Sequence, residues 1–427
     1  MYTAFFLPIS VIAVGLFLLI RLRAFMIFHP LRCIKRLIDG IKKGEARRAL
    51  LLAMAGTLGV GNIFGVSAGI IIGGAGSIFW LLLSSLFSMI IKYSEALMST
   101  ELSVGECGGM HTVLKKLFPR FGACLGMLYA ALCLLLSLFM GSAIQSSAVI
   151  NCAEVSVGLP LPLSAILLLS AVAISCLGGV GEIEKITEKV IPLTTIIYIM
   201  MSIAVIVTNS DRLPTALSDI VSSAFSPLSL GGGALAILSS KALSEGFARG
   251  ILSNEAGAGT SSLAHTRAGG RESADAGLMG AVEVFFDTDI LCLLTGLAIL
   301  VSVDKPSAFS SPMKLVESAY SSVLGELGSL LLFVCILLFA YSTIICWYYY
   351  GSFCFSYLFG ARLKPLFFLL FLGFIPIGGI VDEVSLLPMT DTVILFMTVL
   401  TLMALIRYSR NICLETERAG LVRTKCK

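Results

Sequence analysis

Long stretches of hydrophobic residues, separated by short polar segments, dominate the pattern of this chain. A helix that crosses a bilayer needs about 17–25 predominantly apolar residues, and such windows lie near residues 4–20, 50–73, 77–100, 121–150, 161–178, 187–208, 228–248, 278–302, 327–350, 364–380 and 388–408. Because every backbone polar group must be satisfied inside hydrocarbon, we interpret these windows as helices. The pattern predicts an all-α integral membrane protein with 11 transmembrane helices.

The second of these windows is interrupted near its middle. Residues 50–73 carry no charge, yet the string GTLGVGN occupies residues 56–62. An unwound segment at membrane depth is tolerated only where it lines a cavity or contacts a ligand. In secondary transporters such a break is where substrate and coupling ion bind. Residues 56–62 are therefore the first candidate site.

The distribution of basic residues supports this set of spans. With the N-terminus outside, 25 of the 30 Lys and Arg residues fall in segments expected in the cytoplasm, namely 21–49, 101–120, 179–189, 249–277, 359–364 and 407–427. One false or missing span would destroy this asymmetry. We expect a multi-pass protein of the cell (inner) membrane with a cytoplasmic C-terminus. Its net charge of +4 reflects topology and does not indicate nucleic-acid binding.

The segment around the first window predicts an anchor and a surface helix. No basic residue precedes residues 4–20, no small-residue cleavage pattern follows, and Arg21 and Arg23 come next, so we expect a retained anchor and not a cleaved signal. Residues 31–48 are basic with a regular apolar stripe, which is typical of a helix on the inner leaflet. A solvated linker is the alternative. The stripe consists of Leu31, Ile34, Leu37, Ile38 and Ile41.

Several classes of chemistry are not supported. The 12 cysteines form no C-x-x-C pair, and the three histidines fall in expected cytoplasmic segments, so neither a disulfide framework nor a transition-metal site is predicted. No G-K-[ST] string is present to form a phosphate loop. GVSAG at 65–69 matches the nucleophile pattern of serine hydrolases, but no histidine is expected at membrane depth. We expect no enzyme and no cofactor.

A set of strings resembles the alanine or glycine:cation symporters, also called sodium:alanine symporters. The most specific is SNEAGAG at 253–259, and the resemblance extends from about residue 45 to about residue 405. The chain departs from the family where Phe64 replaces a small residue and Ser147 an asparagine. The other strings are AGTLGVGNIFGVSAG (55–69), GGAGSIFW (73–80), KYSEALMSTEL (92–102), GGVGEIEKITEKVIP (178–192), FARGILSNEAGAGTSSLAH (247–265), VFFDTDILCLLTGLAIL (284–300) and AYSTIICWYYYGSFCFSYLFG (340–360).

The resemblance implies a leucine-transporter-like core of two inverted five-helix repeats with one extra N-terminal helix. The expected units are an anchor and basic linker (1–49), a first repeat (50–208), a second repeat (209–408) and a basic cytoplasmic tail (409–427). The hydrophobic pattern agrees, because a glycine-interrupted span opens each half. The second interruption is expected at the GGG string of residues 231–233. Paired interruptions of this kind indicate a binding site between the repeats.

Helix ends at these interruptions predict how a substrate binds. A half-helix that begins near Asn62 presents free N–H groups and a positive dipole end, which suit a carboxylate. For Gln145 an interhelical hydrogen bond is the alternative, and the spacing of Gly61, Gly65, Gly69 and Gly73 is also typical of a helix-packing face. The expected substrate contacts are Thr57, Gly59, Gly61, Asn62, Phe64, Gln145, Gly232 and Gly233.

Carbonyl oxygens at the end of the first half-helix suit a hard cation. The resemblance implies that this cation is sodium and that hydroxyl groups of the eighth core helix complete its site. The expected ligands are Gly56, Thr57, Leu58, Ser342 and Thr343. The alternative for the hydroxyl groups is a hydrogen bond to a carbonyl of their own helix.

Lys241 and Glu245 are the charged residues that fall inside the seventh window. Their spacing of four positions favours an ion pair that neutralises both within the membrane. A charge relay, in which Lys241 gates a cation or carries a proton, is the alternative.

The resemblance implies a secondary symporter that couples the sodium gradient to import of a small neutral amino acid, alanine or glycine first. Phe64, if it faces the pocket, would shrink it and favour these substrates. The alternatives are a proton-coupled or uncoupled permease and a non-transporting amino-acid sensor on the same fold. The expected partners are the substrate, sodium and the lipid bilayer, without nucleic acid. The sequence does not predict an oligomeric state.

Overall fold

The computed structural model of the protein describes residues 2–42, 44–103, 108–225, 240–266, 272–381 and 383–422, and all regular elements among them are helices. Among these residues, seven helices are long and apolar enough to cross a membrane, and a bent pair makes an eighth if it is taken as one span. Two shorter apolar helices, Phe6–Arg21 and Leu161–Leu177, lie where two further spans are expected. The all-helical membrane class is therefore confirmed, whereas the count of eleven stays a prediction.

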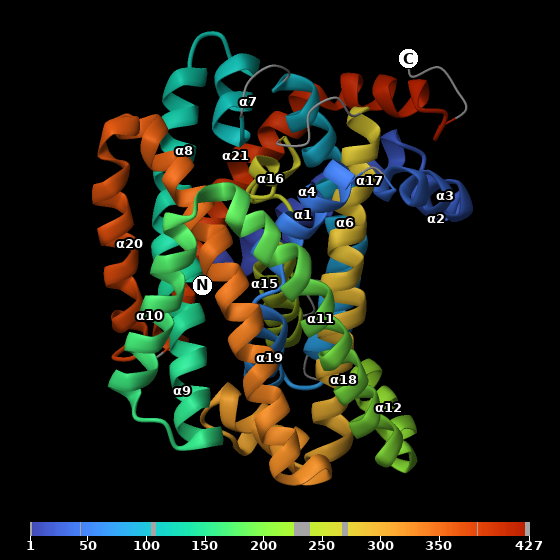
Figure 1. Ribbon diagram of the computed structural model, residues 1–427. Helices are drawn as coiled ribbons and strands as arrows, with labels where there is room; N and C mark the ends of the chain where they lie inside the picture. Colours follow the sequence, from blue (N-terminus) through green and yellow to red (C-terminus); the bar gives the residue numbers. More distant parts are fainter. Residues whose placement is uncertain are drawn as a thin grey trace.

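The elements follow one another with short connections (Figure 1). Three π-helical segments lie between α-helices, and Gly325, with a φ of 61°, divides the longest helix. The elements are α1 Tyr2–Arg21, α2 Phe25–Phe28, α3 Pro30–Ile41, α4 Gly44–Thr57, η1 Gly61–Gly65, α5 Val66–Gly73, α6 Gly76–Leu102, α7 Met110–Leu117, α8 Gly122–Leu138, η2 Phe139–Ile144, α9 Gln145–Val157, α10 Leu161–Leu177, α11 Gly179–Thr208, η3 Ser210–Arg212, α12 Leu213–Ala224, α15 Lys241–Asn254, α16 Ser262–His265, α17 Ser273–Val284, η4 Phe285–Cys292, α18 Leu293–Ser302, η5 Pro306–Ala308, α19 Pro312–Phe359, η6 Ala361–Leu363, α20 Lys364–Gly378 and α21 Glu383–Arg418.

The broken helix α4–η1–α5 runs through the middle of the bundle. Helix α4 packs against α11 and α19, and α5 packs against α6 and α15. Helices α10 and α20 lie at the periphery (Figure 1), where Ile166 and Leu369 are 60% and 66% exposed. Large exposed apolar side chains on the outer helices are what contact with lipid requires.

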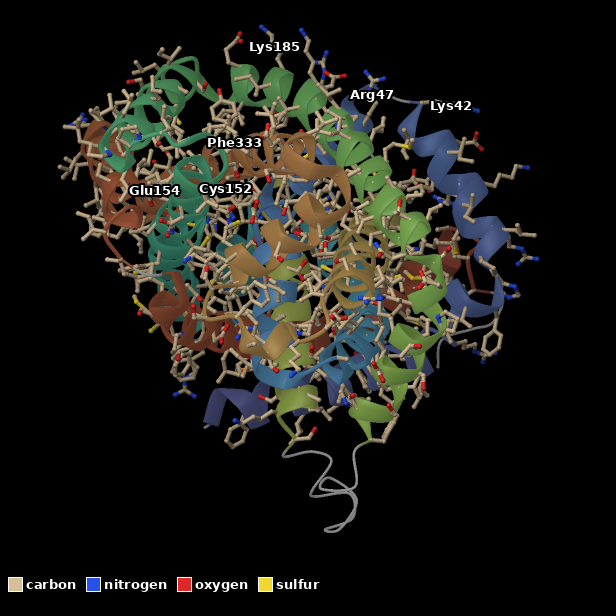
Figure 2. The ribbon with its side chains drawn as sticks, turned by 90° about the horizontal axis from the view of Figure 1, so that it is seen from below. Lys42, Arg47, Cys152, Glu154, Lys185 and Phe333 are labelled. Atoms are coloured by element: carbon tan, nitrogen blue, oxygen red, sulfur yellow. The ribbon has the colours of Figure 1, made fainter. Side chains whose placement is uncertain are left out.

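One end of the bundle carries α2, α3, α7 and the C-terminal part of α21, and we call it the linker end (Figure 1). The predicted amphipathic helix forms there as α3, with Leu31 81% exposed. On its other face Arg36 donates to Asp275 at 2.5 Å and also pairs with Glu272. Figure 2 shows Lys42, Arg47 and Lys185 at the rim of the molecule, and Arg47 pairs with Glu188 of α11.

The expectation that residues 249–277 form a cytoplasmic loop is wrong in its first part. Helix α15 continues to Asn254, and residues 254–265 are buried. The small and hydroxyl-bearing residues of this stretch look like a loop in a hydropathy window. They are instead buried because side chains of neighbouring helices satisfy their backbone polar groups, which the sequence pattern does not reveal.

Close packing of α15 on α6 predicts a cost for adding one methyl group. A Cβ at Gly246 would lie 2.5 Å from Ser77 O and 2.7 Å from Trp80 Cβ, so Gly246→Ala should destabilise the protein by about 1–3 kcal/mol. Gly373→Ala is the control, because that glycine has no atom within 4 Å of its Cβ position. Thermal unfolding of the purified protein in detergent measures both. Equal stability of the two variants would contradict the packing.

Candidate functional site

The first break lies between Thr57, which ends α4, and Gly61, which begins η1. The two halves of the span are bent by 47°. Val60 N donates to Gln145 Oε1 at 3.0 Å, so the amide of η2–α9 replaces a helical hydrogen bond lost at the break. A Cβ at Gly59 would lie 2.8 Å from both Gln145 Oε1 and Thr343 Oγ1. Only glycine allows these two side chains to approach the backbone so closely.

Helix α19 supplies partners for the carbonyl groups at the end of α4. Thr343 Oγ1 donates to Ala55 O at 2.9 Å and lies 3.4 Å from Leu58 O. One turn further along the same face, Trp347 Nε1 donates to Gly56 O at 3.2 Å. The last carbonyls of a helix have no intrahelical partner, so this face of α19 stabilises the break.

The two other predicted hydroxyl ligands do not reach across the break. Ser342 Oγ donates to Leu338 O and Phe339 O of its own helix, each at 2.9 Å. Thr57 Oγ1 lies 3.5 Å and 3.4 Å from carbonyls of α4. Of the predicted ion ligands, Thr343 and Leu58 are the pair that the structure brings together.

A second break follows α15 at residues 255–261. Glu255, Gly257 and Gly259 have φ angles of 53°, 86° and 80°, a left-handed conformation that glycine adopts without steric cost. Every second residue from 255 to 259 has a left-handed φ angle, which explains why glycine alternates with alanine in the AGAG string. The whole segment is buried. The interruption expected at residues 231–233, with Gly232 and Gly233, lies outside the described residues.

Side chains of α8 and α6 bond to the backbone of this second break, and the backbone of α7 bonds to a serine side chain directly after it. Tyr129 OH of α8 donates to Ala258 O at 2.7 Å, and Glu95 Oε2 of α6 accepts from Gly257 N at 3.0 Å. Met110 N at the start of α7 donates to Ser262 Oγ at 3.0 Å. Like the first break, the second depends on hydrogen bonds from outside its own span.

Asp287 joins the two breaks, and sequence reasoning missed it. Asn62 Nδ2 donates to Asp287 Oδ1 at 2.6 Å, and Ser253 Oγ donates to Asp287 Oδ2 at 2.6 Å. All three side chains are buried, and Asn62 Oδ1 has no hydrogen-bond partner among the described residues. An aspartate inside the apolar window 278–302 was the available signal, because a buried charge in a span is costly unless it has a role.

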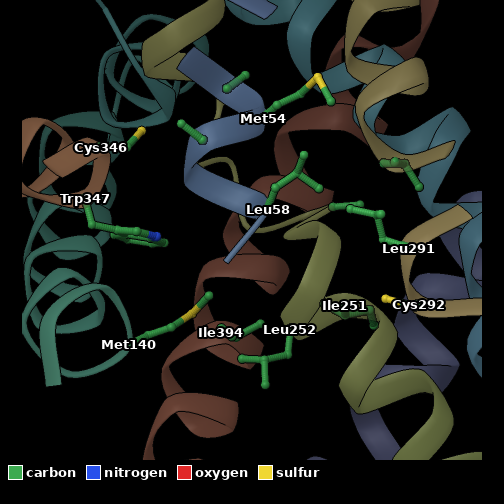
Figure 3. Close-up of a cluster of buried hydrophobic side chains, with 14 of the residues drawn as sticks. Met54, Leu58, Met140, Ile251, Leu252, Leu291, Cys292, Cys346, Trp347 and Ile394 are labelled. Carbon is green, nitrogen blue, oxygen red and sulfur yellow. The ribbon is translucent and has the colours of Figure 1, made fainter. Parts of the chain in front are cut away.

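Apolar side chains enclose the first break. Figure 3 shows Leu58 at the end of α4, with Trp347 to one side and Met140, Leu252 and Ile394 below. These side chains, like Phe64 in η1, are at most 7% exposed. Polar backbone that is bonded to side chains of other helices, inside an apolar enclosure, suits a small ligand with a charged head group and a small apolar side chain.

The ion pair expected between Lys241 and Glu245 does not form. Lys241 is the first residue of α15 and is exposed, whereas Glu245 lies 3.2 Å from Arg249 Nε. Arg249 also contacts Asp391 of α21 at 2.8 Å. The Arg249 side chain is buried in the bundle and reaches both carboxylates, while Lys241 lies exposed at the start of the helix.

Comparisons with known proteins agree with this geometry. A family model described as the sodium:alanine symporter family matches residues 1–418. An uncharacterized transporter of Haemophilus influenzae is 31% identical over 419 residues, covering 94% of this chain and 90% of that protein. The sodium/alanine symporter AgcS of Methanococcus maripaludis is 30% identical over 373 residues, covering 84% and 81%.

A solved structure shows the fold. MhsT in complex with L-phenylalanine superimposes with a TM-score of 0.60 at 16% identity, covering 88% of this chain and 92% of that chain. The expected leucine-transporter-like fold is therefore correct.

The Arg249 cluster predicts a large stability effect. Arg249→Met would leave the partly buried carboxylates of Asp391 and Glu245, which are 15% and 20% exposed, without their cation and should cost about 1–3 kcal/mol. The double variant Arg249→Met/Asp391→Leu should regain much of this loss, and Lys241→Met should be neutral. Thermal unfolding in detergent checks all three. An unchanged midpoint for Arg249→Met alone would show that the cluster does not stabilise the helix bundle.

Proposed function

We propose that the chain, which belongs to the sodium:alanine symporter family, couples the sodium gradient to import of small neutral amino acids, alanine or glycine first. The observation that carries the proposal is the meeting of two broken helices at Asn62, Asp287 and Ser253. Unwound backbone at membrane depth, supported by side chains from several helices, is the arrangement in which transporters hold substrate and ion.

Sodium would bind where α19 faces the end of α4. A hard cation takes oxygen ligands, and Thr343 Oγ1 already lies near Ala55 O and Leu58 O. The other expected ligands are weaker candidates, because Gly56 O accepts from Trp347 and the Ser342 hydroxyl donates to its own helix. We therefore place the ion first at Thr343 and Leu58.

The amino acid would bind beside the first break. Its carboxylate suits the N-terminal end of the half-helix that begins at Gly61, near Gly59 and Asn62. Gln145, which holds Val60 N, would position this backbone and not necessarily contact the substrate. The apolar side chains of Figure 3 would enclose a methyl group or a hydrogen atom.

Coupling would follow from the link between the two breaks. An ion between α4 and α19 shifts the equilibrium between open and closed states only by its differential affinity for them. Because Asn62 and Ser253 share the Asp287 carboxylate, a change at one half-helix alters the contacts of the other. Substrate and sodium together would then permit closure.

A change in sodium dependence tests the ion site. Thr343→Ala removes the hydroxyl oxygen beside Ala55 O and Leu58 O, so the sodium concentration for half-maximal binding of labelled alanine should rise at least roughly tenfold, the loss of about 1.4 kcal/mol. Ser342→Ala is the matched control and should have a smaller effect. A scintillation proximity assay on purified protein measures both. An unchanged sodium titration for Thr343→Ala would contradict this placement.

Substrate range tests the role of Phe64. If its ring limits the pocket, Phe64→Ala should allow valine or leucine to compete with labelled alanine, because the smaller side chain leaves room for them. Competition binding on the purified variant measures this. A range still confined to glycine and alanine would mean that the ring packs against another helix.

A further inference from the structure

Four buried carboxylates face one lysine and one histidine on the linker-end side of the Asn62–Asp287 contact. Lys92 and Glu95 come from α6, Glu283 from α17, and His265 ends α16. With Glu255 of the second break and Asp287 of η4, every side chain of this group is fully buried. None of the glutamates belongs to the site proposed for sodium or amino acid.

Lys92 is the fixed cation of the group. Its Nζ lies 3.3 Å from Glu283 Oε1 and donates to Asn254 O at 2.9 Å. Asn254 is the last residue of α15, so the ammonium also caps the negative end of that half-helix. Glu283 Oε2 in turn lies 3.2 Å from His265 Nε2. Lys92 and Glu283 therefore form an ion pair, although Glu283 Oε1 has no hydrogen-bond partner among the described residues.

Glu95 and Glu255 are only partly satisfied. Glu95 Oε2 accepts from Gly257 N, and Glu255 Oε2 accepts from Thr260 Oγ1, so each glutamate holds the second break through one oxygen. The other oxygen of each, Oε1, is buried and has no hydrogen-bond partner in the part of the chain that the structure describes. If either carboxyl group were ionised, its Oε1 atom would carry negative charge while buried without a hydrogen-bond donor, which is energetically costly.

The charges of the group do not balance. Lys92 offsets Glu283, and even a protonated His265 would leave two of the four carboxylates without a counter-charge among the described residues. An uncompensated buried charge costs several kcal/mol. Protonation of a carboxyl group removes that cost and also supplies an O–H donor.

Buried hydroxyl groups on the opposite side of the segment show the same lack of partners. Thr398 and Thr401 of α21 lie against Gly257 and Gly259, and their Oγ1 atoms have no hydrogen-bond partner. Both side chains are fully buried. The second break is thus bordered on two sides by polar atoms that need a donor or an acceptor.

We propose that Glu95 and Glu255 form a proton-binding site behind the second break, which is protonated in the arrangement seen here. A proton from water forms an O–H bond with a carboxylate oxygen, and the resulting neutral group lets residues 255–260 pack between α6, α8 and α21. This site goes beyond the symport of sodium and an amino acid, because it requires neither ligand.

Several other groups that can titrate surround the two glutamates. The Lys92 ammonium attracts the carboxylates of both Glu95 and Glu255 electrostatically. Further titratable groups face them from α8, α16, α17, η4 and α19, and these are Tyr129, Cys133, His265, Glu283, Asp287, Cys346 and Tyr350.

Infrared spectroscopy tests the proposal directly. A protonated carboxyl group has a C=O stretching band that a carboxylate lacks, and exposed carboxyl groups are ionised at about pH 7. Purified full-length protein in lipid nanodiscs should show this band at that pH. Glu95→Gln or Glu255→Gln should remove intensity equal to about one carboxyl group. A wild-type spectrum without the band, or full intensity in both variants, would overturn the proposal.

Two controls sharpen the test. Glu317→Gln changes a glutamate of α19 that accepts from Ser329 at 2.8 Å outside the group, and it should leave the band unchanged. Glutamine has the shape and neutrality of a protonated glutamate, so both test variants should fold, as judged by size-exclusion chromatography. Unfolding of both would show that ionised carboxylates are required and would also overturn the proposal. Because the spectrum requires no transport, its outcome is independent of the substrate.

Discussion

Backbone hydrogen bonding inside the membrane is the constraint on which the rest of this structure depends. Two helices unwind in the middle of the bundle, and water is not available there to satisfy the polar groups that unwinding exposes. The protein satisfies them with side chains from other helices. Gln145 and Thr343 form hydrogen bonds with the backbone at the first break, and Tyr129 and Glu95 do so at the second.

This constraint also explains where glycine is required. At Gly59 the backbone is approached by two side chains at once, and at Gly257 and Gly259 it adopts left-handed angles. Larger residues would exclude the supporting side chains or strain the turn. The backbone at these glycines can be approached closely because no side chain covers it. Supporting side chains use this access, and a bound ligand would use the same access.

Sequence reasoning predicted much of the fold and part of the site. The hydropathy pattern predicted the all-helical membrane class, and the glycine string predicted the break at residues 56–62. The length and hydrophobicity of a helix depend only on its own residues, so they can be predicted from the sequence without knowing how helices pack. The resemblance supplied the leucine-transporter-like fold, whereas the division into two inverted repeats stays a prediction.

What the sequence did not reveal depends on contacts between helices. SNEAGAG was noted as a specific string, yet its place as a buried break became clear only from its backbone angles and from Glu95 and Tyr129. The hydropathy pattern indicates Lys241 as an intramembrane charge, whereas Lys241 is exposed and the buried charged residues include Lys92, Arg249 and Asp287. Spacing along one helix identified a possible pair, but burial depends on how neighbouring helices pack.

The most direct test of this account is uptake of labelled alanine into proteoliposomes under an imposed sodium gradient, a proton gradient, or neither. The account predicts accumulation above equilibrium with the sodium gradient and only equilibration without an ion gradient. Accumulation driven by protons alone would contradict sodium coupling and shift attention to the buried glutamates. No accumulation of alanine or glycine under any gradient would contradict the assignment of these substrates.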